Sequence, residues 1–479
     1  MSESVSFTTT TGSEATFCYR SRLEAPAAMV FQWHARPGAF ERLTPPWEAV
    51  RIVARSGGIS DGAQVVLRLR LGPWQVPWVA EHCDYIEAQQ FRDVQLQGPF
   101  ARWEHTHRFV ADGPAACYLE DRLVYALPFG LCGRLAGGGL TRRKLQRLFA
   151  YRHRITRHDI ACYATSKGAD SMHVLVSGAS GLVGSALVPF LTAGGHQVSH
   201  LVRRPSPASA ADIPWDPATR TIGTPALEGL DAVVHLAGEN IATGRWTAAK
   251  KARIYVSRVE GTRLLCEALA QLVHPPKVLI CASAIGYYGD RGARVLRETS
   301  APGDGFLAEV CQAWEAATSP AVERGIRVVF LRLGMVLSRA GGALAQLLRP
   351  FQLGLGGVLG PGTQYMSWIA IDDVLGAIQH ILHTDTLRGP VNAVAPQAVT
   401  NRDFTSTLGT VLKRPTLVPM PAFAARLLFG EMADALLLAS TRVEPARLQA
   451  TGFTFAYPEL AGALRHLLGV AAPPQLAAA

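Results

Sequence analysis

The sequence predicts an α/β domain with a doubly wound parallel sheet, preceded by an α+β domain and followed by a small helical cap. The chain has 479 residues, about three times the ~150 residues of a typical domain. Strand patterns that alternate between apolar and polar residues dominate residues 14–135, and continuous apolar strands separated by helical segments begin at His173. Hydrophobic residues make up 48% and charged residues 18% of the chain, which is typical of a protein with a buried core.

The first domain is expected over residues 1–165. A long helix is predicted from about Leu140 to Cys162, because apolar residues recur there at helical spacing, and a short helix is predicted at 27–33 after Pro26. The pattern indicates a curved antiparallel sheet wrapped on one long helix. Its alternating segments are 62–72, 102–111 and 117–128.

A polar stretch without periodicity, residues 166–171, predicts a linker. Residues 172–410 are expected to form the parallel-sheet domain, and residues 411–479 a helical module and tail. The strands HVLVSG, DAVVHLAG, KVLICASA and IRVVFLRLG are apolar at nearly every position, which is typical of parallel strands covered on both faces.

A glycine-rich turn, GASGLVG, follows the first of these strands and precedes a helix. Glycine permits the tight turn, lets backbone N–H groups approach a diphosphate, and allows close packing of helix on strand. This context predicts a dinucleotide-binding (Rossmann) domain. The expected cofactor-binding residues in the turn are Gly178, Ala179, Ser180, Gly181, Leu182, Val183 and Gly184.

The next strand ends in Arg203 and Arg204, where an acidic residue would bind the ribose hydroxyls of NAD. Two guanidinium groups there favour the 2′-phosphate of NADP, so NAD is the less favoured cofactor. Ala237 and Gly238 end a later strand and are expected to border the cofactor. The alternatives are a solvent-facing arginine pair and an ordinary strand-to-loop turn.

Several segments in one order, spread over residues 173–468, resemble the atypical extended short-chain dehydrogenase/reductase group, an NAD-dependent epimerase/dehydratase-like family with its own C-terminal helical module. They are GASGLVG, VVHLAGENI, SRVEGTRLL, SAIGYYG, FLAEVCQAWE, LRLGMVLS, SWIAIDDV and GFTFAYPEL. The resemblance implies a nicotinamide nucleotide cofactor and oxidoreductase or epimerase chemistry on a small molecule.

The chain departs from the catalytic pattern of this superfamily. The resemblance places Phe306 and Val310 where a Tyr-x-x-x-Lys pair does acid/base work. The usual substrate-holding hydroxyl falls on Ala284. Ser283 and Tyr288, with Tyr287 beside it, are the nearest catalytic candidates, and the alternative is that they pack and form a turn hydrogen bond.

Two acidic residues and one arginine in the second half of the chain are expected to have mainly structural roles. Asp372 and Asp373 precede a helical pattern, so an N-cap role is favoured over a catalytic one. Arg332 is expected either to face the substrate or to pair with one of these acids.

Residues 12–165 resemble the START-like polyketide cyclase and lipid-transfer (SRPBCC) superfamily, with a helix-grip fold, in element order and in the segment FRDVQLQGPFARWEHTHRF. The resemblance implies a cavity between sheet and helix that holds a hydrophobic ligand. The candidate lining residues are Trp33, Trp47, Trp74, Trp78 and Trp103, which otherwise fill the core. His105 and His107 share one strand face, but with no third ligand evident no metal site is predicted.

The net charge of +10 is concentrated between Arg142 and Arg157 on the predicted long helix. No nucleic-acid motif accompanies it, so no nucleic-acid partner is expected, and a solvated helix face is favoured over contact with a membrane surface. The eight cysteines show no metal or disulfide spacing, and no signal peptide or transmembrane segment is predicted. The expected location is the cytoplasm.

The leading hypothesis is an NADP-binding oxidoreductase or epimerase-like enzyme for a small, partly apolar substrate, with an N-terminal domain that binds a hydrophobic ligand. The alternative is a non-catalytic, NADP-responsive binding protein, because Phe306 and Val310 cannot transfer a proton. A nucleic-acid scaffold ranks last. Nothing in the pattern specifies the substrate's identity or an oligomeric state.

Overall fold

The computed structural model describes residues 3–9, 14–164, 171–206 and 209–470. The chain divides into two compact units, the first built mainly on Met1–Lys167 and the second mainly on Gly168–Val188 and His196–Leu468. Most of the expected linker at 166–171 lies outside the described residues. No described helix is both long and apolar enough to cross a membrane.

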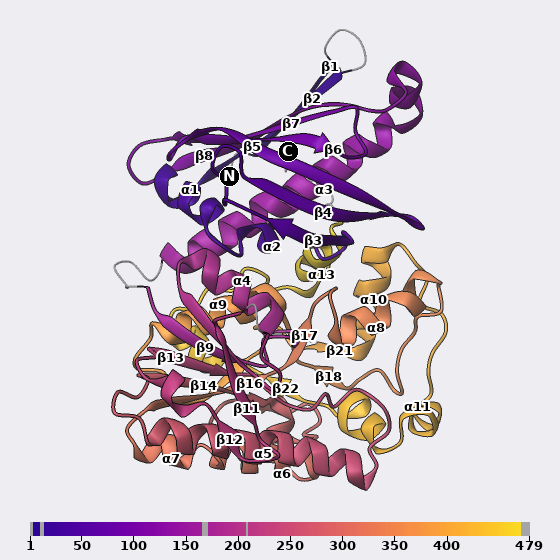
Figure 1. Ribbon diagram of the computed structural model, residues 1–479. Coiled ribbons are helices and arrows are strands. Elements are labelled where there is room, and N and C mark those ends of the chain that lie inside the picture. The colour runs from indigo at the N-terminus through magenta and orange to yellow at the C-terminus, as the bar shows by residue number, and fades with distance from the viewer. Residues whose placement is uncertain (1–2, 10–13, 165–170, 207–208, 471–479) are drawn as a thin grey trace. The chain divides into compact units, whose positions relative to one another are not determined.

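The first unit contains an antiparallel sheet of eight strands and a long helix, α3 (Gly130–Ala164), that packs on it (Figure 1). Two short helices, α1 (Ala27–Ala35) and α2 (Ala39–Leu43), follow the second strand. In sheet order the strands are β1 (Glu3–Thr9), β2 (Glu14–Leu23), β8 (Cys117–Ala126), β7 (Arg102–Ala111), β6 (Gln90–Gln97), β5 (Trp74–Ile86), β4 (Gln64–Leu71) and β3 (Val50–Arg55). This is the expected helix-grip architecture.

Alternation along β7 and β8 decides which side chains face the helix. In β7 the buried positions are Trp103, His105, His107 and Phe109, and in β8 every second residue from Cys117 to Tyr125 is buried. Two histidines and Asp121 therefore share the inner face with aromatic and aliphatic side chains. The inner face of this sheet carries charge as well as apolar surface.

Helix α3 begins ten residues before the expected start at Leu140, at Gly130. Its early part carries Gly133, Gly137, Gly138 and Gly139, and glycine lowers helix propensity, so the sequence pattern did not predict this extension. Later in α3, Phe149 and Ile155 are fully buried and pack in the sheet-side clusters. Arg142, Arg143 and Arg147 are exposed, as expected for the basic face.

The second unit contains a sheet whose strands are parallel except at one edge, with α5, α6 and α7 on one face and α4 and α9 on the other (Figure 1). In sheet order the strands are β12 (Thr221–Ile222), β11 (Asp212–Asp216), β10 (Gln197–Val202), β9 (His173–Ser177), β13 (Ala232–His235), β14 (Val278–Ala284), β16 (Arg327–Leu333) and β20 (Gly389–Ala393). Its helices are α4 (Gly184–Gly194), α5 (Ala248–Ala270), α6 (Phe306–Ala316), α7 (Ser319–Glu323), α8 (Gly342–Gln352), α9 (Ile371–Leu382) and α10 (Asn401–Leu412).

This strand order reverses direction between β9 and β13, as in a doubly wound Rossmann fold. The expected fold class is confirmed. β13 is buried along its whole length and β14 along nearly all of it, which explains why their sequences are apolar without alternation. In such folds ligands bind in a crevice at the carboxyl ends of the strands where the order reverses, which here are β9 and β13.

Three short strand pairs extend this unit beyond the main sheet: β15 (Val295–Leu296) with β22 (Arg442–Val443), β17 (Met335–Leu337) with β19 (Trp368–Ala370), and β18 (Tyr365–Met366) with β21 (Val399–Thr400). The C-terminal helical elements are α11 (Ala422–Phe429), a π-helical turn (Ala433–Leu438), α12 (Ala446–Ala450) and α13 (Leu460–Leu468).

Asp372 and Asp373 attach the C-terminal segment to α9. The N-cap of α9 is Ala370, so both acids lie in the first turn instead of capping the helix as expected. Asp372 Oδ2 lies 2.9 Å from His466 Nε2 on α13. Asp373 accepts backbone hydrogen bonds from Ala456 and Tyr457 at 2.7 and 3.1 Å. These contacts give both acids a structural role.

A buried ion pair between α2 and α3 generates a stability prediction. Arg42 donates to both carboxylate oxygens of Asp159 at 2.8 and 2.7 Å, and neither side chain is appreciably exposed. Replacing Asp159 with Ala leaves the guanidinium charge uncompensated in the core, so we expect a loss of about 3–5 kcal/mol in the free energy of unfolding of the first unit. Urea denaturation with hydrogen–deuterium exchange in α2 and α3 measures it.

The matched control is Arg55→Ala, which removes the exposed pair between Arg55 and Glu41. Exposed pairs contribute less than about 1 kcal/mol, so this variant should stay close to the native chain. Equal losses in the two variants would contradict a special contribution from the buried pair.

Candidate functional site

The glycine-rich turn after β9 is held in a conformation that only glycine permits. Gly178 has φ +68°, and a Cβ there would lie 2.8 Å from the carbonyl carbon of Leu236. A Cβ on Gly184 would lie 2.3 Å from the Gly178 carbonyl oxygen. Real Cβ contacts are not this short, so a side chain at either position would displace the backbone. Both glycines allow the start of α4 and the end of β13 to approach the turn closely.

A buried hydrogen-bond network lies directly beneath this turn. Ser177 Oγ accepts backbone hydrogen bonds from Leu236 and Ala237 at 3.0 and 3.2 Å and lies 2.7 Å from His235 Nδ1. On the other side of the ring, His235 Nε2 lies 3.0 Å from Thr262 Oγ1. Burial lowers the pKa of His235 to about 4, so the imidazole is neutral at physiological pH. Ser177 thus ties the ends of β9 and β13 together.

Sequence analysis did not identify Ser177 or His235 as part of the site. A signal for them was present in the sequence, because each is a polar residue that ends a strand after three apolar residues. A buried polar side chain at such a position needs a hydrogen-bond partner, and here Ser177 and His235 contact each other.

The expected cofactor-binding residues gather at the carboxyl ends of three adjacent strands. Ser180 and Gly181 in the turn are exposed, and Arg203 and Arg204 are exposed directly after β10. Ala237 follows β13, and its backbone N–H lies 2.9 Å from the position of a Cβ on Gly178. The fold brings these groups to one edge of the sheet, as their strand assignments require. Their role in binding a cofactor stays a prediction.

The loop after Gly238 is fixed by a second set of charged contacts. Lys250 Nζ donates to Glu239 Oε1 at 2.7 Å and to Thr243 Oγ1 at 3.1 Å, and Arg258 donates to the Glu239 carbonyl at 3.0 Å. The hydrogen bond from Lys250 lowers the pKa of Glu239, so the carboxylate is ionised. Lys250 is buried despite its charge. This ion pair fixes the segment that borders the crevice after β13.

The positions where an acid/base pair was expected by resemblance lie in an apolar cluster. Val310 on α6 is buried with Trp246, Ile254 and Met432. The Phe306 ring packs on Trp246 with a centroid distance of 5.4 Å. Lys251 Nζ lies 5.1 Å from the centroid of the Phe306 ring. Neither Phe306 nor Val310 carries a group that can transfer a proton.

Ser283 and Tyr288 belong to a buried polar network centred on Arg332. Arg332 donates to both carboxylate oxygens of Glu315 at 2.8 Å and to the Tyr288 hydroxyl at 3.0 Å. Ser283 donates to Glu315 at 2.7 Å, and Tyr288 donates to Asn392 Oδ1 at 2.7 Å. The partner of Arg332 is therefore Glu315 on α6, whereas pairing with Asp372 or Asp373 was one of the expectations.

Both hydroxyls are shielded from solvent, with Tyr288 0% and Ser283 2% exposed. Burial raises the pKa of Tyr288, although Arg332 partly offsets this effect. The phenol is thus a weaker acid than free tyrosine. The catalytic assignment of both residues stays a prediction, and their contacts show how firmly they are held.

A cavity of about 810 Å³ lies inside the first unit. Trp78 and Trp103 line it, together with Phe91 and Phe100. Of the other tryptophans expected in the lining, Trp33 is 1% exposed and belongs to the core, Trp47 packs partly buried against that core, and Trp74 is 72% exposed. The expectation was therefore wrong for these three, because strand alternation and helix packing send their side chains elsewhere.

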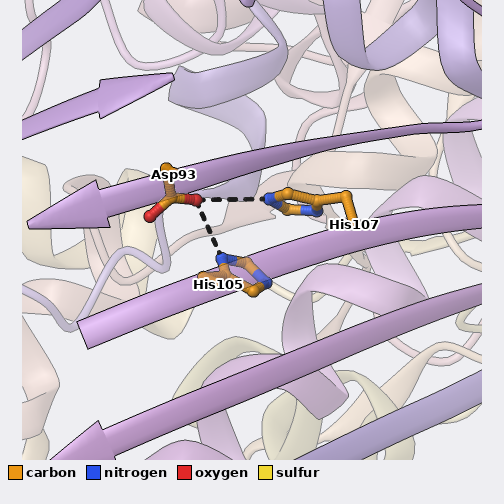
Figure 2. A group of neighbouring side chains, drawn as sticks. All are labelled: Asp93, His105 and His107. Carbon is orange, nitrogen blue, oxygen red and sulfur yellow. Dashed lines mark ion pairs between the residues drawn. The ribbon is translucent and has the colours of Figure 1, made fainter. Parts of the chain in front are cut away.

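A polar cluster of Asp93, His105 and His107 lies on the wall of this cavity (Figure 2). Asp93 on β6 is directly opposite His105 on β7, and His107 is directly opposite Asp121 on β8. Figure 2 shows both imidazole rings directed at one oxygen of Asp93. That atom, Oδ1, lies 3.1 Å from His105 Nδ1 and 3.6 Å from His107 Nε2.

Asp121 lies behind the two histidines and contacts three imidazoles. Its Oδ1 lies 2.9 Å from His105 Nε2 and 2.7 Å from His107 Nδ1, although the latter pair is too poorly aligned for a regular hydrogen bond. Its Oδ2 lies 2.7 Å from His153 Nε2, and Ser21 Oγ lies 2.6 Å from His153 Nδ1.

The electrostatics of the cluster are strongly coupled. Burial opposes the charged form of His105, but Asp93 and Asp121 together raise its pKa to about 9. Burial favours the neutral form of each aspartic acid, but the imidazoles outweigh this effect and hold both carboxyl pKa values below their usual range. The carboxylates are ionised inside the domain.

No third ligand beside His105 and His107 was evident in the sequence, and the structure places Asp93 next to them. The potential ligand atoms of the three side chains all lie within 4.8 Å of one another, so whether the group binds a metal stays untested. Sequence analysis missed Asp93 because the contact depends on the register between β6 and β7.

Comparison with known proteins supports the assignment of both units. Residues 174–393 match the NAD dependent epimerase/dehydratase family, residues 23–149 match a family of polyketide cyclase/dehydrase and lipid transport proteins, and residues 420–467 match a domain of unknown function. An epimerase family protein of Mycobacterium bovis is 44% identical over 291 residues, which are 61% of this chain and 96% of that protein. Human epimerase family protein SDR39U1 is 37% identical over 300 residues, which are 62% of this chain and 100% of that protein.

Two solved structures extend the comparison. A nucleoside-diphosphate sugar epimerase from Corynebacterium glutamicum is 34% identical, covers 94% of this chain and 90% of its own, and has a TM-score of 0.78. Its match therefore includes both units. Human SDR39U1, solved with NADPH, covers 62% of this chain and 99% of its own at 37% identity, with a TM-score of 0.58.

Substitution of Gly184 tests the role of the glycine-rich turn. In Gly184→Ala the new methyl group meets the Gly178 carbonyl oxygen, so the turn must open. We expect nicotinamide nucleotide affinity, measured by calorimetry, to fall at least ~10-fold, equivalent to about 1.4 kcal/mol. The matched control is Gly462→Ala in α13, where a Cβ meets nothing within 4 Å. Unchanged affinity in a folded Gly184→Ala protein would contradict the role of this turn.

Proposed function

The chain belongs to the NAD-dependent epimerase/dehydratase family, and we propose that it is an NADP-binding oxidoreductase or epimerase-like enzyme acting on a small, partly apolar substrate. The observation that carries the proposal is the glycine turn at the crevice between β9 and β13, with two exposed arginines at the end of the neighbouring β10. The turn supplies backbone N–H groups for a diphosphate.

The arginine pair supports NADP as the nucleotide. Arg203 and Arg204 lie where a ribose-binding carboxylate would select NAD. Guanidinium groups bind phosphate in paired, charge-assisted hydrogen bonds but offer no acceptor to a free 2′-hydroxyl. The human relative at 37% identity was solved with NADPH, in line with this preference.

The cavity of the first unit supports a second part of the proposal. A volume of about 810 Å³ is in the range of small-molecule sites, and Trp78, Trp103 and Phe91 supply aromatic lining. We propose that this domain binds a hydrophobic ligand. It either delivers the ligand to the nucleotide-binding domain or acts as a sensor of that ligand. The match of residues 23–149 to polyketide cyclase and lipid transport proteins agrees with such a role.

One observation favours a second candidate function, a non-catalytic protein that responds to NADP binding. Phe306 and Val310 pack in an apolar cluster, and Tyr288 is held by Arg332 and Asn392 with no exposed surface. Under this alternative, nucleotide binding changes the contacts of the domain without hydride transfer. Turnover measurements separate the two functions.

The nucleotide preference is tested by the double substitution Arg203→Ala with Arg204→Ala. Loss of two charge-assisted contacts should weaken NADPH binding by about 10–100-fold and change NADH binding by less than about 3-fold. Calorimetry with both nucleotides measures the difference. Arg388→Ala is the matched control, because Arg388 is exposed directly before β20, at the opposite edge of the sheet. A parallel loss of NADPH and NADH affinity would contradict selection by the arginines.

Catalysis is tested by NADPH consumption with a panel of sugar nucleotides, carbonyl compounds and quinones. We expect turnover by the native chain. Tyr288→Phe leaves Arg332 and Asn392 without their shared partner, so it should cost about 1–3 kcal/mol of stability. If Tyr288 transfers a proton, the kcat of Tyr288→Phe falls further than the smaller fraction of folded protein can explain. Nucleotide binding without turnover of any compound would favour the non-catalytic alternative.

A further inference from the structure

We propose that Asp93, His105 and His107 form a binding site for a divalent transition metal ion, with Zn²⁺ the favoured ion, on the wall of the cavity in the first unit. The proposal is independent of nucleotide binding, because all residues involved belong to the START-like unit. It would give that unit an inorganic cofactor of its own.

Two of the three separations between donor atoms are close to those expected around one shared ion, and all three are within 4.8 Å. Ligands about 2.0–2.1 Å from a tetrahedral zinc lie roughly 3.3 Å from one another. Asp93 Oδ1 lies 3.1 Å from His105 Nδ1 and 3.6 Å from His107 Nε2. The second separation is too long for a normal hydrogen bond but suits two ligands of the same ion. Two imidazole nitrogens and one carboxylate oxygen are also a ligand set found in three-ligand zinc sites.

Asp121 supplies the support that metal-binding histidines usually have. Each imidazole presents one nitrogen to Asp93 and the other to Asp121, at 2.9 Å for His105 Nε2 and 2.7 Å for His107 Nδ1. A carboxylate behind the ring orients the imidazole and makes its outward nitrogen a better donor to a metal. Asp121 supports the His105 ring through a hydrogen bond, and it contacts the His107 ring closely but without regular hydrogen-bond alignment. One carboxylate reaches both rings because each of them lies on β7, next to β8 in the sheet.

Further contacts fix the two carboxylates. Trp103 Nε1 donates to Asp93 Oδ2 at 3.3 Å, which leaves Oδ1 directed at the imidazoles. The second oxygen of Asp121 lies 2.7 Å from His153 Nε2. The site thus has an inner set of three ligands and an outer set that holds them.

The three ligands line the cavity, so a remaining coordination position faces the cavity interior. An oxygen of a bound molecule, such as a carboxylate, an enolate or a ketone oxygen, suits that position, while the apolar remainder lies against Trp78 and Phe91. Arg152 lines the same cavity and favours an acidic ligand. The structure therefore points to a partly apolar molecule with an oxygen donor.

The experiment uses the full chain, expressed without a histidine tag, stripped with a chelator and then titrated with Zn²⁺. We expect one equivalent of Zn²⁺ to bind by calorimetry and to raise the Tm, since an ion bound only by the folded state stabilises it. Co²⁺ serves as a spectroscopic probe and should give the visible absorption of a site with nitrogen and oxygen ligands.

Variants test which residues bind the ion. His107→Gln removes a ligand and should weaken Zn²⁺ binding at least ~100-fold, equivalent to about 2.7 kcal/mol. Asp121→Asn keeps all ligands but alters their support and should weaken binding about 10–100-fold. His82→Gln is the matched control, because His82 lines the same cavity but belongs to no such cluster in the described part of the chain. It should bind Zn²⁺ like the native chain.

Circular dichroism of each stripped variant establishes that it is folded. Because two different variants address the site, misfolding of one leaves the other informative. Less than a tenth of an equivalent of Zn²⁺ bound to the native chain, or equal affinity in native and folded His107→Gln protein, would overturn the proposal. Neither result depends on NADP binding, so the proposed function is judged separately.

Discussion

The nucleotide-binding unit depends on the close approach of two backbone segments at the point where its strand order reverses. Gly178 and Gly184 make that approach sterically possible, because a Cβ at either position would overlap main-chain atoms. Ser177 makes it favourable by accepting hydrogen bonds from Leu236 and Ala237. Both features act together with the pairing of β9 and β13, which extends to Ser177 and His235.

Beside these strands, charged side chains hold the structure together. Glu315 and Arg332 form a buried bidentate pair that also fixes Ser283 and Tyr288. Such pairs are costly to break, since removing one partner strands a charge in the core. Phe306 and Val310 on α6 instead lie within an apolar cluster.

The first unit buries a cluster of charged and polar side chains in its interior. Its sheet buries His105, His107 and Asp121 on the inner face, where apolar residues would cost less to bury. The carboxylates and imidazoles offset that cost by pairing with one another, and Asp121 contacts three rings. A domain needs no such cluster to fold. The cluster lies on the wall of the cavity, where Asp93, His105 and His107 are lining residues.

The sequence by itself determined the features that depend on contiguous residues. The GASGLVG turn, the apolar parallel strands and the alternating strands of the first unit follow from local backbone preference and from the period of side-chain burial. Helix propensity alone understated the length of α3, because glycines near its start are overridden by the surrounding structure.

Only the tertiary structure decided which distant side chains meet. Asp93 reaches His105 because β6 and β7 pair in one register, and a shift of one residue would turn it to the other face. Arg332 on β16 pairs with Glu315 on α6 instead of with Asp372. This is because α6 packs on β14, and β14 lies next to β16 in the sheet. Register and packing are set by the whole chain, so no local pattern contains them.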